Sequence, residues 1–79
     1  MKLSRTHRRA LKVLANAGPR GVTEALMLAH GFTADMLAGL VLVGLATAEP
    51  ETNKACGRTI EVVRIRITAA GRDALADEG

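Results

Sequence analysis

The chain has 79 residues, with 11 Lys or Arg and 8 Asp or Glu, which give a formal net charge of +3. This length accommodates a single domain, which we expect to occupy residues 1–79. Hydrophobic residues make up 48% of the chain, a proportion that excludes a disordered tail. Phe32 is the only aromatic residue, which excludes the stacking platforms that bind single-stranded nucleic acid.

Cysteine content and the apolar runs indicate the compartment. Cys56 is the only cysteine, so no internal disulfide can form and we expect a cytoplasmic protein. The longest apolar run, residues 38–48, is shorter than the roughly 20 residues that span a bilayer, so we expect no membrane insertion. The charges at the start of the sequence are not followed by an apolar segment, so we expect no signal peptide.

Catalytic and metal-binding motifs are not recognisable in this sequence. His7, His30 and Cys56 lack the spacing of metal ligands. The sequence also lacks a carboxylate pair near a histidine, a glycine-rich phosphate loop and a nucleophile elbow. We therefore expect no enzymatic activity, no bound metal and no cofactor.

The first predicted helix follows Ser4, a favourable N-cap residue, and stops at Gly18-Pro19. Its inner stripe consists of apolar residues and one histidine at helical spacing: Leu3, His7, Ala10, Leu11, Leu14 and Ala17. Its outer face is polar and mostly basic: Arg5, Arg8, Arg9, Lys12 and Asn16. This helix is therefore amphipathic.

Two shorter helices are predicted next. Residues 18–21 form a turn by composition, and Thr23 is a favourable N-cap for a helix over residues 24–30. Thr33 is the N-cap candidate for a third helix, whose inner stripe is Met36, Leu37 and Leu40. Gly44 ends this helix because glycine readily adopts the left-handed conformation at a helix C-terminus.

The hydrophobic period then changes to that of strands. Residues 45–49 and 58–68 are predicted strands of a hairpin, joined by an eight-residue loop over residues 50–57. The apolar phase shifts at Val62-Val63, which indicates a β-bulge or a change of face. Arg64 and Arg66 share one strand face and are expected to point to solvent. Thr68 is expected to cap a last helix that runs through Leu75 and frays at its acidic end.

Three segments of the chain resemble motifs of one known protein family. Residues 21–26, GVTEAL, resemble the entry to the second helix of that family. Residues 36–45, MLAGLVLVGL, match the spacing of the third helix and its exit into the first strand of the wing. Residues 66–75, RITAAGRDAL, resemble the family phrase LTxxGRxxL, which closes the wing. In these motifs the chain resembles the winged helix-turn-helix domains of MarR- and PadR-type bacterial regulators. The resemblance implies an α+β fold with a three-helix core, a β-hairpin wing and a short C-terminal helix.

The resemblance also implies a DNA-binding transcriptional regulator, with the third helix in the major groove and the wing on the adjacent backbone. We expect double-stranded DNA to be the partner, because the cations concentrate in residues 1–30 and 58–72. Glu49 and Glu51 are expected to weaken the positive field at the tip of the hairpin. The predicted DNA contacts are Arg5, Arg8, Arg9, Lys12, Thr33, Lys54 and Arg58. The alternative for the basic residues of the first helix is a solvated helix face.

The third predicted helix departs from the family pattern. Its outer positions offer no Arg, Lys, Ser, Thr, Asn or Gln that could read a base edge. A helix that is apolar on nearly all sides is usually buried on more than one side. Val41, Leu42 and Val43 therefore either pack under the hairpin or meet another protein chain. The second hypothesis is thus a winged-helix module for homo- or hetero-oligomeric protein association.

Overall fold

The computed structural model describes residues 4–78, which form four α-helices and a three-stranded antiparallel sheet. In chain order the elements are α1 (Arg5–Asn16), η1 (Gly18–Arg20), β1 (Val22–Thr23), α2 (Glu24–Ala29), α3 (Ala34–Leu42), β2 (Ala46–Ala55), β3 (Arg58–Ile67) and α4 (Ala69–Glu78). The α+β class predicted from the sequence is confirmed, and η1 and β1 are additional to the predicted elements.

The helices begin where the sequence places a hydroxyl. Ser4 Oγ accepts a hydrogen bond from the His7 backbone N at 3.1 Å, and Thr23 Oγ1 accepts one from Leu26 N at 3.3 Å. Thr33 Oγ1 accepts from the backbone N of the third residue after it at 3.1 Å. Each cap satisfies an N–H that would otherwise lack a partner in the first turn, and such a cap contributes about 1 kcal/mol. All three predicted N-caps are confirmed.

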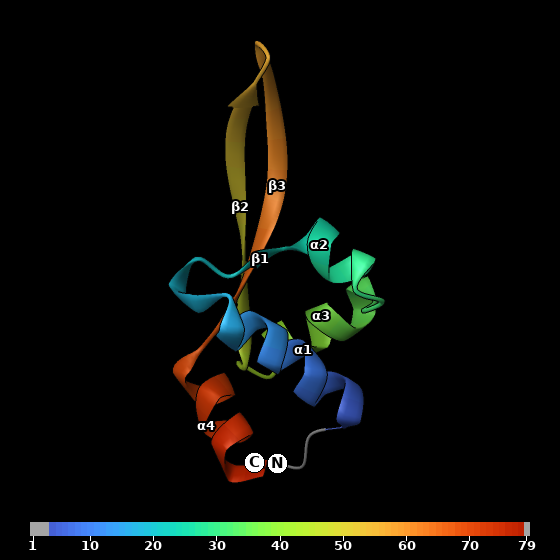
Figure 1. Ribbon diagram of the computed structural model, residues 1–79, viewed down its shortest axis with the longest axis vertical. Coiled ribbons are helices and arrows are strands. Elements are labelled where there is room, and N and C mark those ends of the chain that lie inside the picture. Colours follow the sequence, from blue (N-terminus) through green and yellow to red (C-terminus); the bar gives the residue numbers. More distant parts are fainter. Residues whose placement is uncertain (1–3, 79) are drawn as a thin grey trace.

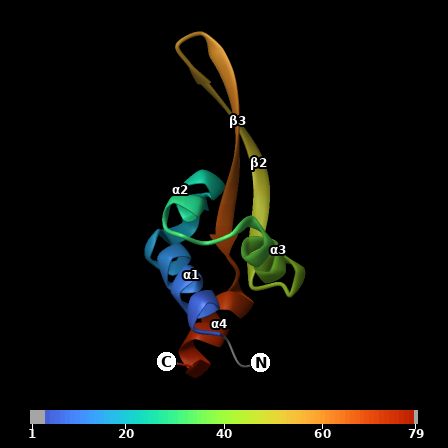
Figure 2. The ribbon, with the colours of Figure 1, turned by 90° about the vertical axis from the view of Figure 1, so that its right-hand side faces the viewer.

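The core forms where the helices meet the sheet. Its buried residues come from α1, α2, α3, all three strands and the loops: Ala10, Leu11, Leu14, Val22, Met27, Phe32, Leu37, Leu40, Leu45, Ala46 and Ile65. Figure 2 shows α1 and α2 beside β3 and α3 beside β2, in agreement with their contacts. The predicted inner stripe of the third helix is confirmed, and that of the first helix is confirmed from His7 to Leu14. Ala17 is exposed because α1 ends before it, and Leu3 lies outside the described residues.

The predicted eight-residue loop is wrong, because residues 50–55 continue β2. Pairing with β3 runs without interruption from Ala46 opposite Ile67 to Ala55 opposite Arg58. Only Cys56 and Gly57 form the turn, with φ values of 52° and 77°. Positive φ at both central residues matches the twist of a two-residue hairpin, and glycine adopts it without steric cost. Pro50 is tolerated because β2 is an edge strand in the order β1-β3-β2.

The predicted bulge at Val62-Val63 is also wrong. Val62 pairs with Glu51 and Val63 pairs with Pro50 in one continuous register. Alternate β3 residues therefore face opposite sides, with Ile65 buried on the side that we call the inner face of the sheet. Ile60 and Val62 lie on the other side, the outer face, with Arg64 and Arg66. The apparent phase shift arises because the outer face carries apolar residues near the tip.

The hairpin projects away from the helices, so the molecule is elongated, with extents of 45 × 21 × 20 Å (Figure 1). Its tip leans toward the side that α1 and α2 occupy, whereas α3 lies on the other side (Figure 2). α4 lies at the end of the molecule opposite the tip (Figure 1). Within the described chain, no helix combines the length and apolar character needed to cross a membrane.

The last helix continues beyond its predicted end at Leu75 and reaches Glu78. Its first turn begins at the predicted cap, because Thr68 Oγ1 accepts from Gly71 N at 3.0 Å. Ala74 and Leu75 then pack against the core, and α1 contacts α4. These contacts support the helix beyond its predicted end.

Candidate nucleic-acid interface

Three of the four cations of α1 are exposed. Arg5, Arg9 and Lys12 are exposed and lie four and three residues apart, so they follow one side of the helix. Arg8 is half-buried. The Arg9 guanidinium carbon lies 5.8 Å from the centre of the Phe32 ring, a cation–π distance. We call Arg5, Arg9 and Lys12 the α1 cation row.

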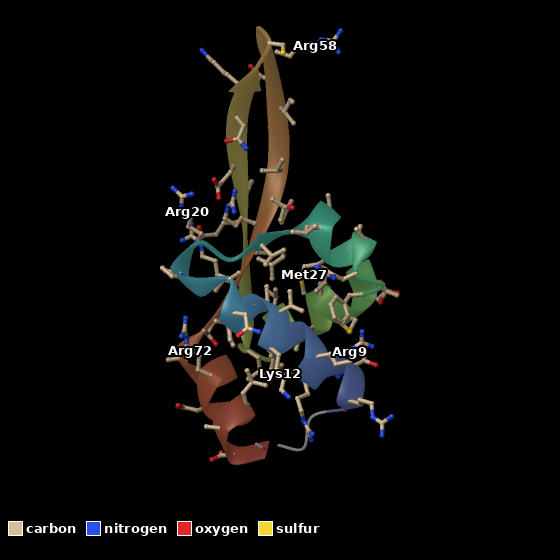
Figure 3. The ribbon with its side chains drawn as sticks, in the orientation of Figure 1. Arg9, Lys12, Arg20, Met27, Arg58 and Arg72 are labelled. Atoms are coloured by element: carbon tan, nitrogen blue, oxygen red, sulfur yellow. The ribbon has the colours of Figure 1, made fainter. Side chains whose placement is uncertain are left out.

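The α1 cation row is not neutralised by carboxylates. Among the described residues, none of its three members forms an ion pair. Figure 3 shows Arg9 and Lys12 on α1 and Arg58 at the far end of the hairpin. The positive charge of the row is therefore exposed to solvent and is not offset by a paired carboxylate.

Lys54 and Arg58 flank the turn of the hairpin and are both exposed. Lys54 pairs with Thr59, and Arg58 pairs with the next residue of β2. Neighbouring pairs in an antiparallel ladder direct their side chains to opposite faces. Lys54 therefore lies on the inner-face side and Arg58 on the outer-face side, so the two predicted contacts do not form one patch.

Thr33 lies at the N-terminus of α3, where its hydroxyl caps the helix. The residues of α3 that follow it with exposed side chains are Ala34, Asp35, Ala38 and Leu42. These side chains offer no hydrogen-bond donor to a base edge, and Asp35 carries the same charge sign as phosphate. The outer side of α3 is therefore unsuited to reading DNA sequence.

The three residues predicted as a partner interface divide into two environments. Val41 is half-buried and lines a shallow groove of about 230 Å³ between α3 and the sheet, together with Ala34, Leu37, Ala38, Ala48, Ile65 and Glu24. Leu42 is 87% exposed and Val43 is 51% exposed. Of the three residues, only Val41 packs against the sheet, whereas Leu42 and Val43 remain exposed.

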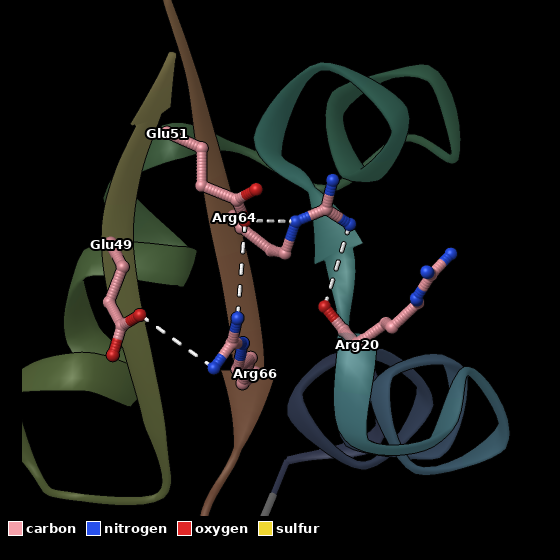
Figure 4. Close-up of polar contacts among 5 residues, drawn as sticks. All are labelled: Arg20, Glu49, Glu51, Arg64 and Arg66. Carbon is pink, nitrogen blue, oxygen red and sulfur yellow. Dashed lines mark hydrogen bonds and ion pairs between the residues drawn. The ribbon is translucent and has the colours of Figure 1, made fainter. Parts of the chain in front are cut away.

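A cluster of charged residues on the outer face of the sheet was not predicted. Arg64 Nε contacts Glu51 Oε2, and Arg66 lies 3.7 Å from Glu49 Oε2 through Nη1 and 4.0 Å from Glu51 Oε2 through Nη2 (Figure 4). Arg20 joins them, because its carbonyl accepts a hydrogen bond from Arg64 Nη1 at 3.5 Å. We call these five residues the sheet arginine cluster.

This cluster corrects two expectations. The side chains of Arg64 and Arg66 do not simply point to solvent; they are partly buried against carboxylates of β2. Glu49 and Glu51 also do not act on the tip, because they pair with these arginines near the middle and base of the hairpin. The sequence did not reveal this cluster because Glu51, the ion-pair partner of Arg64, lay in the predicted loop over residues 50–57.

His7, His30 and Cys56 are dispersed over the fold. His7 Nδ1 lies 2.6 Å from Ser4 Oγ, His30 is exposed near Phe32, and Cys56 is exposed in the hairpin turn. Within residues 4–78, no three His, Cys, Asp or Glu side chains are grouped so that they could hold a metal ion. These residues therefore do not form a common site.

No protein-family model, curated protein or solved structure matches this chain.

Proposed function

We propose that this protein is a winged-helix transcriptional regulator that binds double-stranded DNA mainly through the phosphate backbone. In this proposal, the hairpin is the wing, and the α1 cation row is the principal contact. The order of three helices, a hairpin and a final helix supports the winged-helix assignment.

The α1 cation row is the observation that carries the proposal. Three exposed cations follow one helix face, and no carboxylate among the described residues pairs with them. Other cations of the chain, Arg64 and Arg66, are held by Glu49 and Glu51. The hairpin tip also leans toward the side of α1 (Figure 2), which favours joint contact with one duplex.

Low sequence discrimination is part of this proposal. Phosphate contacts fix the position of a protein on DNA, whereas base contacts provide specificity. The exposed side chains of α3 supply no two-donor contact of the kind that arginine makes with guanine. Affinity should therefore depend strongly on salt and weakly on base sequence.

Fluorescence anisotropy with two unrelated labelled duplexes over a salt series tests the proposal. We expect similar affinities for both duplexes and a steep fall in affinity as salt rises. Lys12→Gln should lower the slope of log affinity against log salt by about 0.9, the value for one lost phosphate contact. Arg72→Gln, which removes the same charge from exposed α4, is the matched control and should leave the slope unchanged. Absence of binding at low salt would refute the proposal.

A second candidate function is protein association through the C-terminal end of α3. The exposure of Leu42 and Val43, at 87% and 51%, favours this function. Adjacent exposed apolar side chains form a contiguous patch, and such patches mark protein interaction sites. Sedimentation velocity of the wild type and of Leu42→Glu tests it. A concentration-dependent oligomer that the variant abolishes supports association, and monomers in both samples refute self-association.

A further inference from the structure

The outer face of the sheet carries a polar pocket that the proposed DNA contact does not use. It has a volume of about 280 Å³ and is lined by Arg20, Glu51, Arg64 and Arg66. The pocket lies where η1 approaches the hairpin, and Figure 4 shows Arg64 between Glu51 and the Arg20 carbonyl, with the Arg20 side chain extending outward. Segments that are distant in the sequence therefore build one site.

Two of the guanidinium groups are held in place. Arg64 is fixed at Nε by Glu51 and at Nη1 by the Arg20 carbonyl. Arg66 is oriented by Glu49 and Glu51 through its two terminal nitrogens. Because these contacts already restrict the side chains, a ligand would pay little of the conformational entropy that ordering a free arginine costs.

The pocket retains unused hydrogen-bond donors. Among the described residues, Arg66 Nε has no hydrogen-bond partner although it is covered, and an unsatisfied donor of this kind costs free energy that a small rearrangement toward an acceptor would recover. The Arg20 guanidinium is exposed and has no ion-pair partner within residues 4–78. A simple cross-strand ion-pair ladder would explain Arg64 and Arg66, but it assigns no role to Arg20.

Charge also favours an anion. The cluster holds three guanidinium groups and two carboxylates, and the carboxylates of Glu49 and Glu51 pair only with Arg64 and Arg66, which leaves an excess of positive charge. Guanidinium groups present paired N–H donors whose geometry matches the oxygens of phosphate. We infer that this pocket binds a phosphoryl group, either free phosphate or the phosphate of an ester or nucleic acid, with Arg20 as the residue that closes on it.

Titration of ¹⁵N-labelled protein with inorganic phosphate, with chloride at matched ionic strength as the reference, tests this inference. We expect saturable shifts of the Arg64 and Arg66 Nε–H signals and of the Gly21 amide. Arg20→Gln should weaken phosphate binding about tenfold, the effect of losing one charge-assisted contact. Arg72→Gln is the matched control, because it removes the same charge from α4, and should bind phosphate as the wild type does.

A second variant separates geometry from charge. Arg66→Lys keeps the positive charge but removes the guanidinium fork and its Nε donor, so it should also weaken phosphate binding. Thermal unfolding of each variant checks that the fold is retained. Equal weakening in Arg20→Gln and Arg72→Gln, or shifts that chloride reproduces, would overturn the inference.

A parallel titration with duplex DNA distinguishes the sources of the phosphoryl group. Shifts at Arg64 and Arg66 with inorganic phosphate assign the site to a free phosphate or ester, and shifts with DNA alone assign it to backbone phosphate. Both outcomes support a phosphoryl site, whereas no saturable shift with either ligand refutes it. The proposed DNA contact is tested separately, by the effect of Lys12→Gln on the salt slope. A negative phosphate titration would therefore refute the pocket without refuting the DNA contact.

Discussion

Thr68 Oγ1 donates a hydrogen bond to the Gly44 carbonyl at 2.7 Å and thereby joins the end of α3 to the start of α4. The same hydroxyl accepts from Gly71 N at 3.0 Å, so it also caps α4. Thr68→Val removes both bonds at similar volume and should lower the free energy of unfolding by about 1–3 kcal/mol. Urea denaturation measures the change. Thr52→Val in the exposed part of β2 is the control and should change stability by less than about 0.5 kcal/mol.

Gly71 lies where α4 crosses the chain after α3. A Cβ at this position would lie 2.2 Å from the Leu45 carbonyl oxygen and 2.7 Å from Ile67 Cγ1. Alanine normally stabilises a helix relative to glycine, but here the overlap with backbone should destabilise the fold by about 1–3 kcal/mol.

Gly39→Ala is the matched control for Gly71→Ala. Gly39 also lies in a helix, α3, and a Cβ there would meet open space. This substitution should stabilise the protein by about 0.5–1 kcal/mol, the usual difference between the two residues in a helix. If thermal unfolding gives Gly71→Ala a melting temperature equal to or higher than that of the wild type, the close approach of Gly71 to the Leu45 carbonyl is contradicted.

Leucines five positions apart on α3 should differ sharply in their contribution to stability. Leu37 is 2% exposed in the core, whereas Leu42 is 87% exposed. Leu37→Ala should cost about 2–5 kcal/mol through lost burial and the cavity left behind. Leu42→Ala should change stability by less than about 0.5 kcal/mol. Similar losses in both variants, measured by chemical denaturation at low protein concentration, would show that Leu42 is buried in the monomer.

The two cations at the hairpin tip should contribute unequally to DNA binding. Lys54 and Arg58 belong to neighbouring ladder pairs and therefore lie on opposite faces of the hairpin. If a duplex meets one face, only one of Lys54→Gln and Arg58→Gln should lower the salt slope, by about 0.9. The anisotropy titrations described above measure both slopes. Equal reductions would instead mean that the tip enters a groove and contacts both strands.

The local features of the fold were predictable. Ser4, Thr23, Thr33 and Thr68 cap helices as expected, because each cap bond joins residues only three positions apart. Apart from Ala17, which lies beyond the end of α1, the inner stripes of α1 and α3 were also correct, since helical periodicity decides which side chains share a face. The α1 cation row follows from the same periodicity.

The strand features were predicted less well. Pro50 and the polar residues after it were interpreted as a loop, although they pair with β3 as an exposed edge strand. Pairing partners come from a distant part of the chain, and polar residues are compatible with strands whose faces meet water. The composition of residues 50–57 therefore could not distinguish a loop from the distal part of a hairpin.

The sequence by itself determined the helices, their caps, the apolar stripes and the cations of α1, because these depend on residues within one or two turns. Only the tertiary structure decided the register that places Glu51 beside Arg64, and the packing that half-buries Val41 but leaves Leu42 in water. Register and burial depend on contacts between segments far apart in the chain. For the same reason the sheet arginine cluster, which unites Arg20 with residues of β2 and β3, became visible only in the folded molecule.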